Sequence, residues 1–361
     1  MAPPLIVERA GSNQFNRVTL KRPRWLKSNF RPSRGRQKLI VMRPILSRAL
    51  LAACLLLALA LLAAAETPRA DAVVSAVGDA DFTTVQEAIN NAPQTTTSEK
   101  PWVILIKPGT YRELIHAQRE KRFVRLVGED PLTTTITYGL FASMKGPDGK
   151  DIGTFRTPTV TIDADDFTIE KLTLENSAGP VGQALALRVD GDRVAFRNCH
   201  LNGFQDTILL NRGRQYFENC TITGAVDFIF GGATAFFDRC TLHCVRDGYI
   251  TAASTPVESP YGFVFLNCTI TTRPSVKVYL GRPWRPHAST IFLNTHMPEG
   301  VRPEGWHNWD KPEREATTRY SESGSTGPGA APDRRVKWAR LLDERQLQDL
   351  TLSRILGGWT P

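Results

Sequence analysis

The stretch Phe196–Gly231, FRNCHLNGFQDTILLNRGRQYFENCTITGAVDFIFG, contains one pattern twice. The pattern is phenylalanine, any residue, asparagine, cysteine, any residue and an aliphatic residue. It begins at Phe196 and again at Phe217, 21 residues later. Related copies begin at Phe237 and Phe265, after steps of 20 and 28 residues. Repeats of this length indicate a solenoid, in which each copy forms one layer and buries its apolar side chains against the next layer.

The apolar alternations within the repeat are short and are broken by Gly and Asn, which is typical of strands and turns. The expected fold is therefore an all-β parallel β-helix, in which equivalent positions of adjacent coils lie ~4.8 Å apart. Seven residues after the first two repeat cysteines come Asp206 and Asp227. Asp247 has the same offset in the third copy, and Ser275 has it in the fourth. The repeat thus predicts a column of stacked carboxylates that starts at Asp206.

Two carboxylates one strand spacing apart do not both ionise easily, so one becomes a proton donor and the other stays anionic. The same division occurs in glycosidases and aspartic proteases, and stacked aspartates also bind Ca²⁺ or line a solvated face. Gln183 and Gln205 offer amide donors for a developing oxyanion, and Arg282 could hold one aspartate charged. Together these residues favour acyl transfer at an ester carbonyl, with an aspartate as nucleophile.

The positive charge of the chain is concentrated at its N-terminus. The net charge is +9, but residues 1–65 hold 12 Lys/Arg and one acidic residue, which leaves 33 Lys/Arg against 35 Asp/Glu in residues 66–361. An apolar run follows Arg48 and ends in an Ala-rich segment at Ala65, as in a secretory signal peptide. We expect cleavage near Ala65 and a secreted or periplasmic protein, with a retained membrane anchor as the alternative. Met42 is a possible true start, and the charge distribution gives no support to nucleic-acid binding.

Residues 66–361 are expected to form a single domain. Thr83–Asn90 predicts a short helix that caps the N-terminal end of the solenoid, with a capping box at Thr83/Gln86 or Thr84/Glu87. Residues 342–355 have apolar side chains at helical spacing and predict a C-terminal helical segment that packs back on the solenoid. Four cysteines of this part occupy the apolar slot of the repeat and a fifth is Cys244, so we expect a buried ladder of reduced thiols.

Five short motifs then follow one another along the chain: Gly109-x-Tyr111-x-Glu113, Gln183–Leu187 (QALAL), Gly203–Thr207 (GFQDT), Asp227–Gly231 (DFIFG) and Leu280–Trp284 (LGRPW). In these motifs and their order the chain resembles the pectinesterase, or pectin methylesterase, family over roughly Ala72 to Trp359. The resemblance is to members of bacterial type without an inhibitory pro-domain.

The resemblance implies a right-handed parallel β-helix, formed by one chain, that removes methyl esters from pectin (methylated homogalacturonan) without a cofactor or metal. By this resemblance Asp227 is the nucleophile, and Asp206 protonates the departing methanol and then activates water. Gln183 and Gln205 would hold the oxyanion, and Arg282 would orient Asp227.

The resemblance also suggests four aromatic side chains for the substrate site. Trp284 and Trp306 would be walls for the sugar, with ordinary packing as the alternative. Phe228 could lie in the core or in the cleft, and Phe155 is a further candidate for a substrate contact. The protein is expected to act as a monomer, without nucleic acid and without stable membrane association after cleavage.

Two other functions remain open on the sequence. One is a related β-helix esterase acting on a thioester or an acetylated sugar. The other is a non-catalytic solenoid that binds polysaccharide. Polysaccharide lyases and hydrolases share the fold, but their reaction would shorten the polymer.

Overall fold

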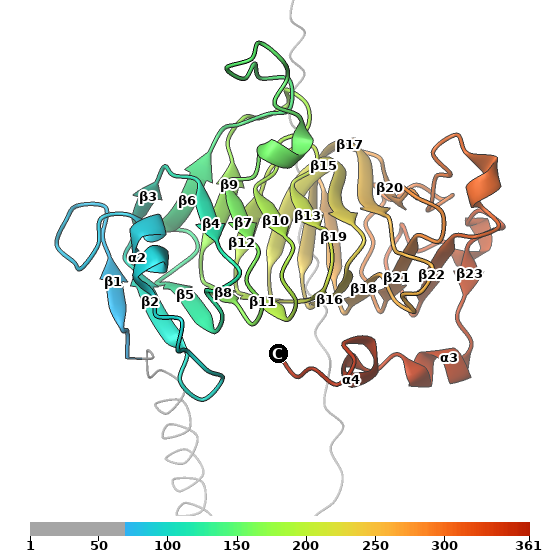
Figure 1. The fold of residues 1–361 in the computed structure, drawn as a ribbon. Helices are drawn as coiled ribbons and strands as arrows, with labels where there is room; N and C mark the ends of the chain where they lie inside the picture. Colours follow the sequence, from blue (N-terminus) through green and yellow to red (C-terminus); the bar gives the residue numbers. More distant parts are fainter. Residues whose placement is uncertain (1–68) are drawn as a thin grey trace, which may run out of the picture. The chain divides into compact units, whose positions relative to one another are not determined.

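The computed structural model describes residues 69–361, so the predicted leader, with Met42 and the cleavage near Ala65, lies outside the described residues. The compact unit Thr67–Pro361 is built of parallel strands stacked along one axis (Figure 1). In the described part of the chain, no helix combines the length and the apolar character needed to cross a membrane. The parallel β-helix predicted from the repeat is confirmed.

The first face of the β-helix is a sheet of strands that pair in chain order, one from each coil. Its members are β1 (Ala72–Val74), β2 (Trp102–Ile106), β5 (Val124–Gly128), β8 (Thr168–Glu170), β11 (Val194–Arg197), β14 (Arg214–Glu218), β16 (Thr234–Asp238), β18 (Phe263–Leu266), β21 (Ser289–Leu293), β22 (Arg319–Ser323) and β23 (Arg340–Leu341).

Two further faces are joined by two long strands, β15 (Thr221–Gly231) and β17 (Thr241–Ala253), which run through both. The second face contains β3 (Gly109–Tyr111), β6 (Thr134–Tyr138), β9 (Thr173–Asn176), β12 (His200–Asn202) and β19 (Thr269–Thr272). The third face contains β4 (Ile115–Ala117), β7 (Val160–Ile162), β10 (Leu187–Val189), β13 (Ile208–Leu210) and β20 (Val278–Gly281).

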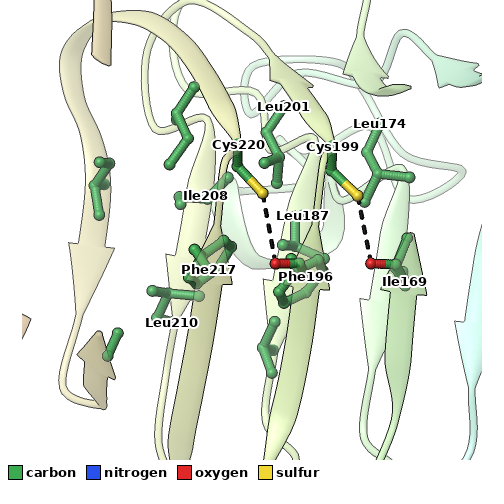
Figure 2. Packing of buried hydrophobic residues seen from close by; sticks show 14 of the residues in the cluster. Ile169, Leu174, Leu187, Phe196, Cys199, Leu201, Ile208, Leu210, Phe217 and Cys220 are labelled. Atoms are coloured by element: carbon green, nitrogen blue, oxygen red, sulfur yellow. Dashed lines mark hydrogen bonds between the residues drawn. The ribbon is translucent and has the colours of Figure 1, made fainter. Parts of the chain in front are cut away.

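The repeat fixes the register of the coils. Phe196 of β11 pairs with Phe217 of β14, and their rings stack with centroids 4.6 Å apart. Figure 2 shows this stack in the interior, beside Cys199 and Cys220. Each thiol donates to a backbone carbonyl of the preceding coil, Cys199 to Ile169 at 3.4 Å and Cys220 to Phe196 at 3.6 Å. Identical residues therefore meet at the same place in successive coils.

The asparagine of the repeat has a conformational role. Asn198 and Asn219 lie between a strand of the first face and a strand of the second, with φ of 53° and 51°. Asparagine tolerates this left-handed region better than other residues with a Cβ. The pattern Phe-x-Asn-Cys thus combines an inward ring, a left-handed turn and an inward thiol.

The five described cysteines are free and buried, as expected, and burial raises the pKa of the Cys199 and Cys220 thiols. We predict that a thiol reagent will not label the folded protein that begins at Glu66, because deeply buried thiols rarely ionise or meet the reagent. Unfolding in denaturant without reductant should release five reactive thiols. A count of three or one would show that cysteine pairs are oxidised.

Three short helices accompany the strands. Helix α2 (Val85–Asn91) lies at the N-terminal end of the solenoid, and α3 (Glu344–Asp349) and α4 (Leu352–Ile355) belong to the C-terminal segment. Three 3₁₀ turns lie in loops: Thr154–Arg156, Pro312–Arg314 and Pro332–Arg334. Helix α2 begins two residues later than predicted, because Thr84 is its N-cap and accepts from the Glu87 amide at 3.3 Å. The Glu113 carboxylate accepts from the first two amides of α2, at 2.9 and 3.0 Å.

The C-terminal segment packs on the outer side of the first sheet, as predicted. Ile355 and Leu356 lie buried against Tyr216, Phe236 and Val264. Leu342, Leu347 and Leu350, whose spacing predicted the segment, are partly buried against the same cluster. The segment therefore covers an apolar strip of the first sheet.

Candidate active site

The two aspartates of the repeat lie in adjacent coils. Gln205 bridges to Val226 in parallel register, and the Asp206 amide donates to the Val226 carbonyl at 3.0 Å. Asp206 and Asp227 both have left-handed backbone, with φ of 61° and 51°. A left-handed non-glycine residue is uncommon and occurs often at functional sites. The predicted pairing of the two carboxylates therefore agrees with the register of the coils.

Arg282 binds Asp227 through both carboxylate oxygens. Its Nε donates to Oδ1 at 2.9 Å and its Nη2 donates to Oδ2 at 2.7 Å. Strand β20 sets this geometry, because Gly281 pairs with Thr251 and a Cβ on Gly281 would lie 2.0 Å from the Thr251 Oγ1. Glycine is therefore required next to the arginine. The predicted Arg–Asp pair is present in the structure.

Two aromatic rings hold the Arg282 guanidinium between them. Its Cζ lies 3.8 Å from the ring centroid of Tyr249 and 3.7 Å from that of Trp309. Contacts of a guanidinium with aromatic faces are attractive and restrict its orientation. The sequence reasoning missed both rings, although Trp309 follows the predicted Trp306 by only three residues.

Burial and charge give the two carboxyl groups different proton affinities. Burial, reinforced by the negative charge of Asp227, raises the pKa of Asp206 to about 8. Burial also raises the pKa of Asp227, but the two hydrogen bonds and the charge of Arg282 oppose this shift. Within residues 69–361, no cationic side chain makes a comparable bidentate contact with Asp206. At neutral pH the proton of the pair therefore resides on Asp206, and Asp227 is the anion.

The raised pKa of Asp206 has a consequence for stability. The folded state holds this proton up to about pH 8, whereas the unfolded chain releases it near the ordinary value of 3.8. The contribution of Asp206 to the free energy of unfolding is thus complete below pH 4. It is lost at about 1.4 kcal/mol per pH unit as the pH rises through this window.

We predict that Asp206→Asn flattens the pH dependence of stability between pH 5 and pH 8. Urea titrations of both proteins at the two pH values measure the effect. If the free energy of unfolding changes between pH 5 and pH 8 by the same amount in the variant as in the wild type, Asp206 ionises normally.

The carboxyl pair opens into a cavity of about 400 Å³. Its lining includes most of the predicted site: Gln183, Gln205, Asp206, Asp227, Arg282, Phe155 and Trp284. Thr154, Phe230, Ala252 and Trp309 complete it. Gln183 bridges in parallel to Gln205, so the two amide side chains come from neighbouring coils, like the aspartates. An anion, a carboxylic acid and two amide donors thus face one space, which suits attack on an ester and stabilisation of its oxyanion.

The cation-site alternative has less support from the geometry. Both carboxylate oxygens of Asp227 are engaged by Arg282. Within residues 69–361, no group of three or more His, Cys, Asp and Glu residues is placed to hold a metal ion.

Comparison with known proteins identifies the family. A family model named Pectinesterase matches residues 71–358. Pectinesterase 31 of Arabidopsis thaliana is 39% identical over 279 residues, covering 75% of this chain and 87% of its own. The chain belongs to the pectinesterase family.

Solved structures agree with this assignment. Pectin methylesterase from carrot superposes with a TM-score of 0.76 at 32% identity, over 81% of this chain and 95% of that one. A pectin methylesterase solved with a hexasaccharide superposes with a TM-score of 0.71 at 33% identity, over 82% of this chain and 99% of that one.

Two aromatic residues predicted for the substrate site of this pectinesterase-family chain lie in its core. Trp306 is 1% exposed and packs against Phe292 and Tyr320, so the prediction that it forms a wall of the site was wrong. Its backbone forms a parallel bridge with Gly281, which extends the pairing of the third face by one coil. The ring that reaches the cavity is Trp309, which has a φ of 62°.

Phe228 is also fully buried in the core. Of the two positions expected for it, core or cleft, the structure shows the core. The left-handed Asp227 interrupts the alternation of β15, and Phe228 turns inward over Gly224. A Cβ on Gly224 would lie 2.2 Å from the Phe228 Cβ. The phenylalanine that lines the cavity is instead Phe230, whose ring lies edge-on to Trp284 with centroids 5.7 Å apart.

Asp247 does not continue the carboxylate column. The register between β15 and β17 shifts after Gly224, so Val226 pairs with Tyr249. Asp247 therefore falls in the extra residues of β17, where its exposed carboxylate accepts from the Lys277 amide at 2.8 Å. The same shift places Tyr249 against Arg282.

Proposed function

We propose that this chain is a carboxylic ester hydrolase that removes methyl esters from pectin and releases methanol and free galacturonate. The observation that carries the proposal is the carboxylate of Asp227, held by Arg282 beside the proton-bearing Asp206 in a cavity lined by two amides. Membership of the pectinesterase family supplies the substrate class.

In the proposed reaction an oxygen of Asp227 attacks the ester carbonyl carbon, and the oxyanion of the tetrahedral intermediate accepts hydrogen bonds from Gln183 and Gln205. The intermediate collapses to an acyl-enzyme anhydride as the C–O bond to the methoxy group breaks. Asp206 gives its proton to the departing methanol. The Asp206 carboxylate then takes a proton from water, which hydrolyses the anhydride and frees Asp227.

Phe155, Trp284 and Trp309 are proposed to contact the sugar ring. All three line the cavity, and Phe155 is 52% exposed, so its ring is accessible to a ligand.

The direct test uses protein purified from residue 66 onward and highly methylated pectin. Acid release by titration and methanol formation should rise together, one for one, while the polymer keeps its length. Hydrolysis of acetyl esters or thioesters in preference to methyl esters would favour the related esterase. Binding of pectin without methanol would favour the non-catalytic solenoid, and chain shortening would indicate a lyase or hydrolase.

The same proposal has residues 1–65 acting as an export leader and residues 66–361 acting as one monomeric enzyme outside the cytoplasm, where polymeric pectin is accessible. We predict that expression of the full chain in a secreting host gives a mature N-terminus near Glu66, read by mass spectrometry of the exported protein. Recovery of exported protein that still carries Met42 or earlier residues would contradict the leader.

A further inference from the structure

The two rings that hold the Arg282 guanidinium belong to different kinds of structure. Tyr249 is part of β17, whose backbone pairs with β15 on one side and β20 on the other. Trp309 lies in the irregular loop 307–311. Loop backbone is less constrained than paired strand backbone, so further contacts must keep the ring of Trp309 on the guanidinium.

The backbone of this loop is unusual at the tryptophan. Trp309 has a φ of 62° and Asp310, the next residue, has a φ of 52°. Two successive residues other than glycine thus take the left-handed region. Such residues are uncommon, and they persist only where the surrounding structure holds them. The turn at Trp309 therefore depends on specific support.

The side chain of His307 supplies this support. Its Nδ1 accepts a hydrogen bond from the Trp309 amide at 3.0 Å, and the Oδ1 of Asn308 accepts from the Asp310 amide at 3.0 Å. Because a backbone amide only donates, this ring nitrogen of His307 carries no proton. An acceptor two residues before the amide is the arrangement of an Asx turn. The imidazole thus takes the place of an asparagine oxygen at Trp309.

The same imidazole also contacts the ring on the other side of the guanidinium. Its centroid lies 5.6 Å from that of Tyr249 and 5.3 Å from that of Tyr279, with interplanar angles of 65° and 62°. Edge-to-face contacts of aromatic rings are favourable. His307 therefore contacts the ring of Tyr249 and the backbone of Trp309, so one side chain joins the two supports of Arg282.

The ends of the loop are fixed to the turn 281–284, which carries the catalytic arginine. The His307 amide donates to the carbonyl of Gly281 at 3.1 Å. The Nη1 of Arg314 donates to the carbonyls of the last two residues of the turn, at 2.7 and 3.2 Å. With both ends fixed, the conformation of the middle of the loop decides where the ring of Trp309 lies.

We propose that His307 is a positioning residue for the ester hydrolysis. Its Nδ1 holds the left-handed turn that keeps the Trp309 ring on the Arg282 guanidinium. Arg282, so held, presents Nε and Nη2 to Asp227 in the geometry that keeps this carboxylate ionised and oriented. The inference rests on the proposed pectin methylesterase activity and adds to it a residue outside the lining of the catalytic cavity.

The test separates the hydrogen bond of His307 from the packing of its ring. His307→Phe keeps an aromatic edge against Tyr249 and Tyr279 but removes the acceptor. It should lower kcat for methanol release from methylated pectin about fivefold, the order of one lost hydrogen bond, with KM unchanged. His307→Asn offers its Oδ1 to the Trp309 amide as in an Asx turn, and should restore kcat to within about twofold of the wild type.

The matched control is His296→Phe. His296 is an exposed histidine of another loop, and its Nδ1 lies 3.4 Å from the hydroxyl of Thr326. This substitution should leave kcat unchanged. Equal losses of kcat in His307→Phe and His307→Asn would overturn the proposal, and so would a rise in KM with kcat unchanged, which would place His307 in sugar binding alone.

Trp309→Ala tests the route of the effect. Because His307 acts through Trp309, His307→Phe should cause no further loss of kcat in protein that already carries Trp309→Ala. Losses that multiply in the double variant would refute this route.

Hydrogen exchange at the Nε of Arg282, followed by NMR, gives a readout that needs no turnover. The signal is assigned by its absence in Arg282→Lys. Exchange should be about fivefold faster in His307→Phe than in the wild type and unchanged in His307→Asn. Equal exchange in the three proteins would contradict the positioning role.

If His307→Phe does not fold, His307→Leu lacks the same acceptor and replaces it in both measurements. Absence of methanol release by the wild type would refute the proposed function, whereas the exchange measurement would still decide whether His307 positions Arg282.

Discussion

Asp227→Ala is expected to lower the rate of methanol release from methylated pectin by about 10³-fold or more, because it removes the carboxylate that forms the acyl-enzyme. Asp227 is the carboxylate that Arg282 binds through its Nε and Nη2, and it lines the cavity with 5% exposure. Initial rates of methanol formation with saturating pectin measure the effect.

The matched control for this variant is Asp247→Asn. Asp247 has the same offset from its repeat cysteine, but the register shift between β15 and β17 places it at an exposed edge. Its substitution should leave the rate within a factor of about two, as is usual for surface changes. Equal losses in both variants, or full activity in Asp227→Ala, would contradict the assigned roles.

Asp206→Asn is expected to lower the rate on methyl esters by about 10²- to 10⁴-fold, the usual contribution of a general acid–base group. The reaction requires Asp206 to be protonated and Asp227 to be ionised, so the two groups limit the rate at opposite ends of the pH range. The wild-type rate should fall as the pH rises through about 8, because Asp206 then loses the proton that methanol needs. It should also fall at low pH, where Asp227 becomes protonated. The pH–rate profile of the variant should lack the alkaline fall.

An ester with an acidic leaving group distinguishes the two roles proposed for Asp206, which are to protonate the leaving group and then to activate water. A nitrophenyl ester of galacturonate needs no proton on departure, so Asp206→Asn should release about one equivalent of nitrophenol per enzyme in a burst and then stall. Asp227→Ala should show no burst. A slow steady release without a burst in Asp206→Asn would mean that water attacks the ester directly.

The repeat predicted a large part of the fold because its copies adopt the same backbone conformation and bury the same side chains. Phenylalanine and cysteine point inward, and asparagine takes the left-handed turn. The spacing of 21 residues between Cys199 and Cys220 therefore predicted which strands pair. The same spacing predicted that Asp206 and Asp227, each seven residues after its cysteine, stack in adjacent coils.

The sequence reasoning failed where the repeat is interrupted. The left-handed Asp227 reverses which side chains of β15 point inward, so Phe228 is buried and Phe230 lines the cavity. Extra residues in β17 displace Asp247 and bring Tyr249 to Arg282. Trp306 and Trp309 have the same chemistry and lie three residues apart, so only the path of the backbone decides which one reaches the cavity.

Infrared difference spectroscopy measures directly which of Asp206 and Asp227 carries the proton. At pH 6 the wild type should show the carbonyl band of a protonated carboxylic acid in the buried pair. The band should disappear in Asp206→Asn and titrate away in the wild type near pH 8. Loss of the band by pH 5, or its persistence in Asp206→Asn with loss in Asp227→Asn, would show that Asp206 is not the proton carrier.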